Sequence, residues 1–234
     1  MPNAVITGAT QGIGKAIAEK LLEQGFSLAI CARNQEELDS LKTGWQARYP
    51  QATILALKAD VGVKEEVLSF AADVMDEFAV VDILVNNAGI YLPGNIETEE
   101  DGHLERLMSV NLFSAYHLTR SLLPTIHQSR KGHIFNICSV AALKAYPGGG
   151  SYSISKYALL GFSDNLREEL KDTTIRVTAL SPGAVYSRSW SSSGVAESRI
   201  MQVSDVADML WASYSLSAMA NVENIVMRPQ KGDL

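Results

Sequence analysis

Short apolar runs alternate with longer helical patterns along all 234 residues, and this alternation limits the folds open to the chain. The runs are rich in Val, Ile and Leu without strict polar alternation, which is typical of parallel strands buried on both faces. Between them, apolar residues recur at helical spacing, as Ile13, Ile17 and Leu21 do in the first helical segment. We expect strands at residues 3–7, 27–32, 53–59, 82–86, 133–138, 175–181 and 224–227, and helices at 12–24, 35–47, 64–78, 99–128, 151–172 and 204–218.

This order predicts right-handed strand–helix–strand crossovers. We therefore expect an α/β fold with a doubly wound, seven-stranded parallel sheet and helices on both faces. The apolar content of 47% is enough for a large core. No linker, repeat or low-complexity segment interrupts the pattern, so residues 1–234 are expected to form a single domain.

Composition and charge exclude several classes of protein. The net charge of −6 argues against a general nucleic-acid binder, which is usually basic. No apolar run approaches the ~18 residues that span a bilayer, and the N-terminus lacks the pattern of a cleavable signal. We expect a cytoplasmic protein with no membrane partner. Cys31 and Cys138 lie in strand-like runs and are expected to be buried thiols; neither the cysteines nor the histidines have metal-ligand spacing, so no metal site is expected.

The first expected strand ends in the glycine-rich turn Thr7-Gly8-Ala9-Thr10-Gln11-Gly12-Ile13-Gly14, and a helix follows at once. Glycines allow a tight turn and a close approach to a pyrophosphate, which the free N–H groups of a helix N-terminus attract. An ordinary glycine-rich loop is the alternative. The strand–turn–helix context favours phosphate binding.

Tyr152 and Lys156 stand four positions apart in an expected helix, so their side chains share one face. Lowering a tyrosine pKa from ~10 to ~7 takes roughly 4 kcal/mol, at about 1.36 kcal/mol per unit. An ammonium ~4 Å away supplies about that much at an effective dielectric near 20. The pair therefore suits a tuned general acid/base, although the same spacing also occurs on solvated helix faces.

The order of the motifs resembles that of the short-chain dehydrogenase/reductase family over essentially the whole chain. The shared motifs are the glycine-rich turn, Asp60-Val61, Asn86-Asn87-Ala88-Gly89, Asn111, Ser139, the Tyr152/Lys156 pair and Pro182-Gly183. The resemblance implies a Rossmann fold, with a cofactor half at about 1–130 and a catalytic and substrate half at about 131–234. It implies an NAD(P)-dependent oxidoreductase that transfers a hydride to or from a carbonyl carbon.

The resemblance also implies the catalytic residues. Tyr152 would be the proton donor, and Ser139 would orient the substrate carbonyl beside it. Lys156 would bind the nicotinamide ribose as well as tuning Tyr152, and Asn111 would hold a water that opens a proton relay. The implied catalytic set is Asn111, Ser139, Tyr152 and Lys156.

The end of the second strand indicates which nicotinamide cofactor is preferred. NAD-preferring relatives carry an Asp or Glu there, whereas this chain has Ala32 followed by Arg33. No carboxylate repels a 2′-phosphate, and Arg33 can pair with one in bidentate fashion. We expect NADP(H) to be preferred over NAD(H). By resemblance, the cofactor would contact Gly8, Thr10, Gln11, Gly12, Ile13, Gly14, Arg33, Asn34, Asp60, Val61, Asn87, Ala88, Gly89, Tyr152, Lys156, Pro182, Gly183, Val185 and Ser187.

The substrate side is less defined by the sequence. Tyr146, Tyr186 and Trp190 are candidate substrate contacts because they stand beside the catalytic positions or in the segment that covers the substrate in relatives. The short C-terminus resembles that of bacterial sepiapterin-reductase-like members. The leading expectation is NADPH-dependent reduction of a ketone to an alcohol. The alternatives are a 3-oxoacyl-[acyl-carrier-protein] reductase, an NAD-linked alcohol dehydrogenase and a non-catalytic NADP(H)-binding sensor. Relatives assemble through their two long helices, so a homodimer or homotetramer is expected.

Overall fold

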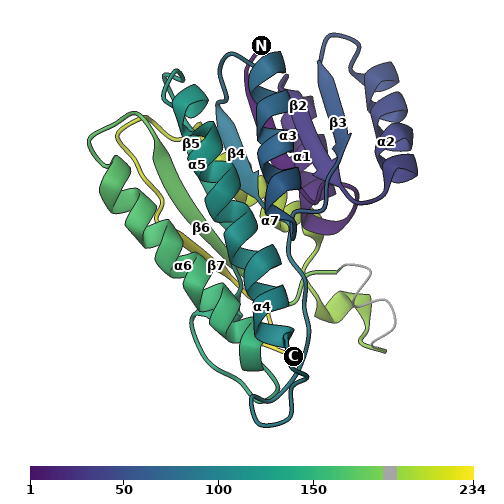
Figure 1. Ribbon diagram of the computed structural model, residues 1–234, viewed down its shortest axis with the longest axis vertical. Coiled ribbons are helices and arrows are strands. Elements are labelled where there is room, and N and C mark those ends of the chain that lie inside the picture. The colour runs from purple at the N-terminus through teal and green to yellow at the C-terminus, as the bar shows by residue number, and fades with distance from the viewer. Residues whose placement is uncertain (187–193) are drawn as a thin grey trace.

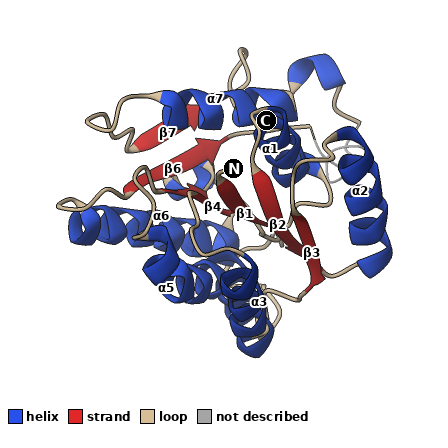
Figure 2. Cartoon of the chain, turned by 90° about the horizontal axis from the view of Figure 1, so that it is seen from above, coloured by secondary structure: helices blue, strands red, loops and turns tan. Residues whose placement is uncertain are grey.

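The computed structural model describes residues 1–186 and 194–234 of the chain. Seven parallel strands form one sheet in the order β3-β2-β1-β4-β5-β6-β7, which confirms the expected doubly wound fold (Figure 2). The strands are β1 (Asn3–Thr7), β2 (Ser27–Ala32), β3 (Ile54–Lys58), β4 (Ile83–Asn86), β5 (His133–Ile137), β6 (Arg176–Pro182) and β7 (Asn224–Met227). The helices, which are labelled in Figure 1, are α1 (Gly12–Glu23), α2 (Gln35–Arg48), α3 (Lys64–Glu77), α4 (His103–Met108), α5 (Ser114–Ile126), α6 (Gly150–Leu170) and α7 (Val203–Ser215).

Two helical layers cover the sheet. Helices α1, α2 and α7 lie on one face, and α3, α5 and α6 lie on the other (Figure 2). Each layer closes its own apolar core: Ile17, Leu38 and Leu210 belong to the first, and Val74, Leu122 and Leu166 to the second. Because both faces are covered, the central strands carry apolar residues on both sides, which explains why their sequences lack strict alternation.

The chain begins at the centre of the sheet, runs outward to β3 and then returns to β4 beside β1. The strand order therefore reverses between β1 and β4. In open parallel sheets, ligands bind at the carboxyl ends of the strands where the order reverses. A ligand site is therefore expected at the carboxyl ends of β1, β4 and β5 and in the segments that follow them.

The long helix expected at residues 99–128 is interrupted and starts later. The helix begins at His103, preceded by Gly102 in a left-handed conformation (φ 87°), so residue 99 lies in a loop. Between α4 and α5 the chain makes a π-helical turn, Ser109–Phe113, which contains the buried Asn111. The other element ends differ from expectation by a few residues at most. The π turn therefore sets the orientation of the Asn111 side chain.

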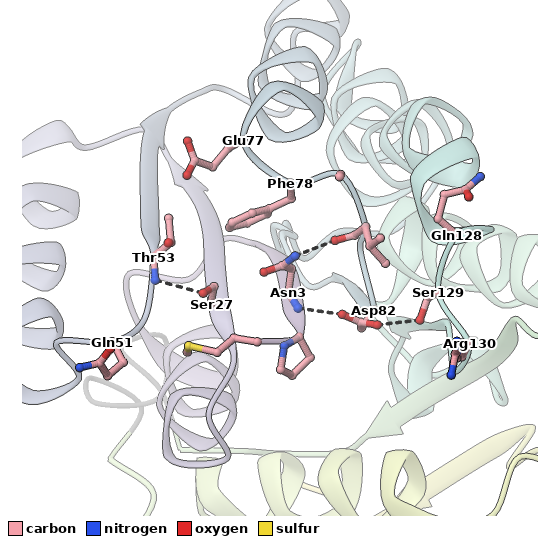
Figure 3. Close-up of a pocket in the computed structure, with 14 residues that line it drawn as sticks. Asn3, Ser27, Gln51, Thr53, Glu77, Phe78, Asp82, Gln128, Ser129 and Arg130 are labelled. Carbon is pink, nitrogen blue, oxygen red and sulfur yellow. Dashed lines mark hydrogen bonds between the residues drawn. The ribbon is translucent and has the colours of Figure 1, made fainter.

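A cavity of about 740 Å³ opens at the opposite edge, where the strands begin (Figure 3). Several of the polar groups that line it are bonded to one another. The Asp82 carboxylate accepts from the backbone N–H of Asn3 at 2.8 Å and from the Ser129 hydroxyl at 2.7 Å. These bonds tie the starts of neighbouring strands together, and we assign the cavity no chemistry.

Two further expectations from the sequence concern the cysteines and the possibility of a membrane-spanning helix. Cys31 and Cys138 are both buried and unpaired, as expected. Within the part of the chain that the structure describes, no helix is both long enough and apolar enough to cross a bilayer.

Candidate active site

The glycine-rich turn leaves the end of β1 at the point where the strand order reverses. Gly8 and Gly12 have φ of 67° and 57°, a region that side chains with a Cβ rarely adopt. Gly14 is needed for a different reason: a Cβ there would overlap the carbonyl oxygen of Gly8 and the side-chain nitrogen of Asn87. The N-cap residue of α1, Gln11, makes no side-chain capping bond, so its helix start is open to an anion.

Asn87 fixes this turn to the end of β4. Its side-chain nitrogen donates to the carbonyl oxygens of Thr7 (2.9 Å) and Gly8 (3.0 Å). In return, the Thr7 hydroxyl accepts from the backbone N–H groups of Asn87 (3.1 Å) and Ala88 (2.9 Å). The sequence leaves open whether Asn87 has a structural role or touches cofactor. The structure gives its side chain a structural role.

The residues expected around the adenosine end follow β2 and β3. Arg33 is exposed directly after β2. Asn34 caps α2 by accepting from the backbone N–H of Glu37 at 3.2 Å. Asp60 and Val61 follow β3 and are partly buried, and the Asp60 carboxylate accepts from the backbone N–H of Gly62 at 2.9 Å. These side chains lie at the same edge of the sheet as the glycine-rich turn.

Lys156 is 6% exposed, and its ammonium donates to the carbonyl oxygen of Ile137 at 2.9 Å. The ammonium nitrogen lies 6.0 Å from the centre of the Tyr152 ring. A Cβ added at Gly89 would lie 3.4 Å from that nitrogen and 3.3 Å from the side-chain oxygen of Asn111. The segment after β4, the π turn and α6 therefore converge on one point.

Asn111 is held from two sides. Its side-chain oxygen accepts from the backbone N–H of Ile90 at 2.8 Å, and its nitrogen donates to the Ile90 carbonyl oxygen at 3.1 Å. The same nitrogen donates to the Ser155 hydroxyl at 2.9 Å, and that hydroxyl donates to the carbonyl oxygen of Tyr152 at 2.7 Å. Ser155 is fully buried. A chain of hydrogen bonds thus joins the segment after β4 to the backbone of Tyr152.

The electrostatics of Tyr152 differ from the sequence expectation. Burial raises the pKa of Tyr152 above its usual value of 10, although a side-chain hydrogen bond with Ser139 opposes the shift. Burial also lowers the pKa of Lys156. The expectation that Lys156 lowers the pKa of Tyr152 is not met in this structure. The reason is that the ammonium turns toward Ile137 and burial dominates both groups.

Two further tyrosines lie near Tyr152. The Tyr91 ring meets the Tyr152 ring edge-to-face, with centroids 4.9 Å apart and planes at 86°. Tyr146, from the segment before α6, is partly exposed, and burial followed by the neighbouring Tyr91 raises its pKa. Ser139 stands at the end of β5 and also accepts from the backbone N–H of Ala141 at 3.1 Å. Tyr91, Tyr146 and Tyr152 therefore form an aromatic cluster, and Ser139 bonds to Tyr152 within it.

The segment after β6 is only partly described. The backbone N–H of Gly183 donates to Met227 at 2.8 Å, which fixes the Pro182-Gly183 step against β7. Val185 is buried in the core and pairs with Met201, so its side chain faces away from solvent. The partly buried Tyr186 also bonds to Met201 through its backbone. Ser187 and Trp190 lie outside the described residues.

Sequence reasoning missed two residues near the site, Ser155 and Glu99. Ser155 stands between Tyr152 and Lys156, yet helical spacing alone does not mark it. Glu99 was expected inside a helix, but it accepts hydrogen bonds from Ser151 at the start of α6. Gly102 was the available signal, because a glycine there allows the helix to begin later.

Comparison with known proteins agrees with this architecture. The family described as short chain dehydrogenase matches residues 2–197. An uncharacterized oxidoreductase of Staphylococcus epidermidis is 30% identical over 226 residues, covering 97% of this chain and 96% of the relative. The alcohol dehydrogenase of the archaeon Thermococcus sibiricus, solved with 5-hydroxy-NADP, superposes with a TM-score of 0.90 at 26% identity, covering 98% and 97% of the two chains. A metagenomic short-chain oxidoreductase solved with NADP gives a TM-score of 0.83 at 28% identity over the same shares. The chain belongs to the short-chain dehydrogenase/reductase family and is an oxidoreductase.

Proposed function

We propose that the protein reduces a ketone to an alcohol with NADPH, with Tyr152 as the proton donor. The observation that carries this proposal is the convergence of Gly89, Asn111 and Lys156 beside Tyr152, at the carboxyl ends of β4 and β5. The open N-terminus of α1 and the glycine-rich turn lie at the same edge of the sheet. A dinucleotide whose pyrophosphate rests on that turn would extend toward this point.

The residues present fit a nicotinamide dinucleotide. The pyrophosphate would rest against residues 8–14, where Gly8, Gly12 and Gly14 carry no side chain and α1 offers uncapped N–H groups. Asp60, Val61 and the backbone of residues 87–89 would line the adenosine and ribose side. Lys156 would bind the nicotinamide ribose, and residues 182–187 would lie along the nicotinamide. When bound, NADPH would supply the hydride that reduces the carbonyl carbon.

The preference for NADP(H) rests on Arg33. Ala32 leaves no carboxylate at the end of β2, and Arg33 is exposed where a 2′-phosphate would lie. Two solved relatives carry NADP or a derivative of it, which supports the same cofactor class. An NAD-linked alcohol dehydrogenase is correspondingly disfavoured.

The protein's own groups would move the proton. Because burial raises the pKa of Tyr152, its phenol keeps its proton at neutral pH, as a donor must in the direction of reduction. Ser139 bonds to the same side chain and would hold the substrate oxygen beside the phenol. Both hydrogen bonds would strengthen as negative charge develops on that oxygen. Lys156 and the Asn111 network would then return a proton to Tyr152.

The tyrosine rings around Tyr152 indicate which class of substrate would bind. Tyr91 and Tyr146 lie beside Tyr152, so a planar or aromatic ketone would pack well there. Tyr186 and Trp190 remain candidate substrate contacts. A sepiapterin-like pterin ketone fits this description, whereas a 3-oxoacyl chain on a carrier protein calls for a basic docking surface. Reduction of pterin and aryl ketones in preference to an acetoacetyl thioester is therefore expected.

The test is NADPH oxidation, followed by absorbance, with diketones, quinones, pterins and an acetoacetyl thioester as substrates. Tyr152→Phe should lower kcat by ~10² to 10⁴-fold, the usual contribution of a general acid, while NADPH binding measured by fluorescence changes little. Tyr157→Phe, which removes the hydroxyl of another tyrosine in the same helix but keeps its ring, is the matched control and should behave like the wild type. A Tyr152→Phe variant that retains most activity would refute the assigned role. Tight NADPH binding without turnover of any substrate would support the sensor instead.

We also propose that the protein is a homodimer or homotetramer. Phe113 and Tyr116 in the π turn and α5, and Ile154 and Tyr157 in α6, are all more than 40% exposed. Apolar and aromatic side chains gathered on two adjacent long helices are typical of a surface that a second copy covers. Sedimentation of the purified protein measures the number of subunits.

A further inference from the structure

Glu99 bonds to the first turn of α6, the helix that carries Tyr152. Its two carboxylate oxygens accept from Ser151, one from the backbone N–H at 2.8 Å and the other from the hydroxyl. The two residues are 52 positions apart. The helix has little capping of its own: Gly149, its N-cap residue, has no side chain to offer, and its first turn holds no acidic residue. Glu99 therefore caps α6 from another part of the chain.

The backbone on both sides is shaped for this contact. Gly150 has a φ of 34°, and a Cβ there would overlap the Glu99 carboxylate and approach the carbonyl oxygen of Gly94 to 2.6 Å. Two more bonds join the same segments. The backbone N–H of Gly94 donates to Gly148 at 3.1 Å, and that of Gly148 donates to the Asn95 side chain at 3.2 Å. The loop before α4 and the turn before α6 are thus one bonded unit.

This unit holds Tyr152 at two points. Ser151, which Glu99 binds, immediately precedes Tyr152 and is 4% exposed. At the other end of the loop, the Tyr91 ring packs edge-to-face on Tyr152. A carboxylate at a helix N-terminus also meets the positive end of the helix dipole. The hydrogen bonds from Ser151 lower the pKa of Glu99, which keeps it ionised and accepting at neutral pH.

We infer that Glu99 is a positioning residue for Tyr152, acting through its bonds to Ser151. The inference rests on the proposed function for its effect on turnover. A displacement of about 1 Å at a reacting group lowers a rate by about 10²-fold, so a cap that fixes the start of α6 fixes the phenol relative to the carbonyl. Glu99 itself touches no reacting atom.

The experiment compares Glu99→Ala with Glu99→Gln. The glutamine oxygen can still accept from the Ser151 N–H, and its nitrogen can donate to the Ser151 hydroxyl. We expect Glu99→Ala to lower kcat about 10- to 100-fold, with the KM for NADPH unchanged within about twofold, because the glycine-rich turn is not altered. Glu99→Gln should restore most of the turnover. Glu100→Ala, at the exposed neighbouring residue, is the matched control and should leave kcat unchanged.

A second readout does not depend on activity. Amide hydrogen exchange in the ligand-free protein should accelerate at residues 150–153 in Glu99→Ala but not in Glu99→Gln or Glu100→Ala. If the wild type reduces no ketone, the proposed function fails alone, and this exchange measurement still decides the contact: unaltered exchange overturns it. The positioning role is also overturned if Glu99→Ala lowers only Tm, with kcat per NADPH-binding site unchanged. A Glu99→Gln variant as slow as Glu99→Ala overturns it as well.

Discussion

The side-chain nitrogen of Asn111 donates a 2.9 Å hydrogen bond to the Ser155 hydroxyl, although the two residues are 44 positions apart. Both are almost wholly buried, with 1% and 0% of their surface exposed. Ser155 in turn donates to the carbonyl oxygen of Tyr152 at 2.7 Å. The π turn and α6 are therefore coupled through a serine that lies between the two residues of the Tyr152/Lys156 pair.

Ser155→Ala should lower both the stability of the protein and its kcat. The substitution leaves one N–H of Asn111 buried without a partner, which costs about 1–3 kcal/mol of unfolding free energy. We expect kcat to fall as well, because Asn111 loses one of its two supports, while KM for NADPH stays near the wild-type value. Urea denaturation and steady-state kinetics measure the two effects.

Ser153→Ala is the control for that variant. The Ser153 hydroxyl is also buried, yet it has no hydrogen-bond partner among the described residues. Its removal should leave stability unchanged or slightly improved. Equal losses in the two variants would mean that the effect comes from the helix rather than from the bond to Asn111.

Arg33→Ala should raise the KM for NADPH while barely changing that for NADH. Hydrogen bonds to charged groups contribute about 1.5–3 kcal/mol, so a rise of about tenfold or more is expected. Arg48→Ala, an exposed arginine at the end of α2, controls for the change in net charge. Similar effects of Arg33→Ala on both cofactors would contradict the assignment of a 2′-phosphate contact.

Acid should destabilise the protein through His133. The ring is fully buried and stacks on the Phe135 ring, with centroids 3.9 Å apart. The Thr178 hydroxyl donates its proton to the carbonyl oxygen of Val222. That hydroxyl therefore accepts from Nε2 of His133, which lies 2.7 Å away. Burial, followed by the charges of Arg176 and Lys131, holds the pKa of His133 well below 6.5. The unfolded chain therefore binds a proton first as the pH falls.

The stabilising effect of a neutral His133 is thus complete above the unfolded pKa of about 6.5 and declines below it, at up to about 1.4 kcal/mol per pH unit for one proton. Urea denaturation at pH 7.5 and pH 5.0 measures the loss. His133→Gln cannot titrate, so its stability should change less between the two conditions. Parallel losses in both proteins would assign the effect to other groups, such as His117, whose pKa burial also lowers.

Local sequence decided much of this protein. Runs of Val, Ile and Leu between helical segments determined a parallel sheet with two covered faces, because a doubly buried strand needs no polar face. The glycine-rich turn and the four-residue spacing of Tyr152 and Lys156 are also local, since turn geometry and helix periodicity act over a few residues. These features were sufficient to predict the fold and to name a candidate site.

Only the tertiary structure decided how that site is held and charged. Gly102 makes the expected helix begin later, which leaves Glu99 in a loop where it caps α6. The π turn points Asn111 at Ile90 and Ser155. The direction of the Tyr152 pKa shift also reversed, because burial depends on what packs around a side chain and not on its neighbours in sequence. The Asn111–Ser155 and Glu99–Ser151 contacts join residues that are 44 and 52 positions apart in the sequence. Such distant pairs leave no periodic pattern, so only the folded chain reveals them.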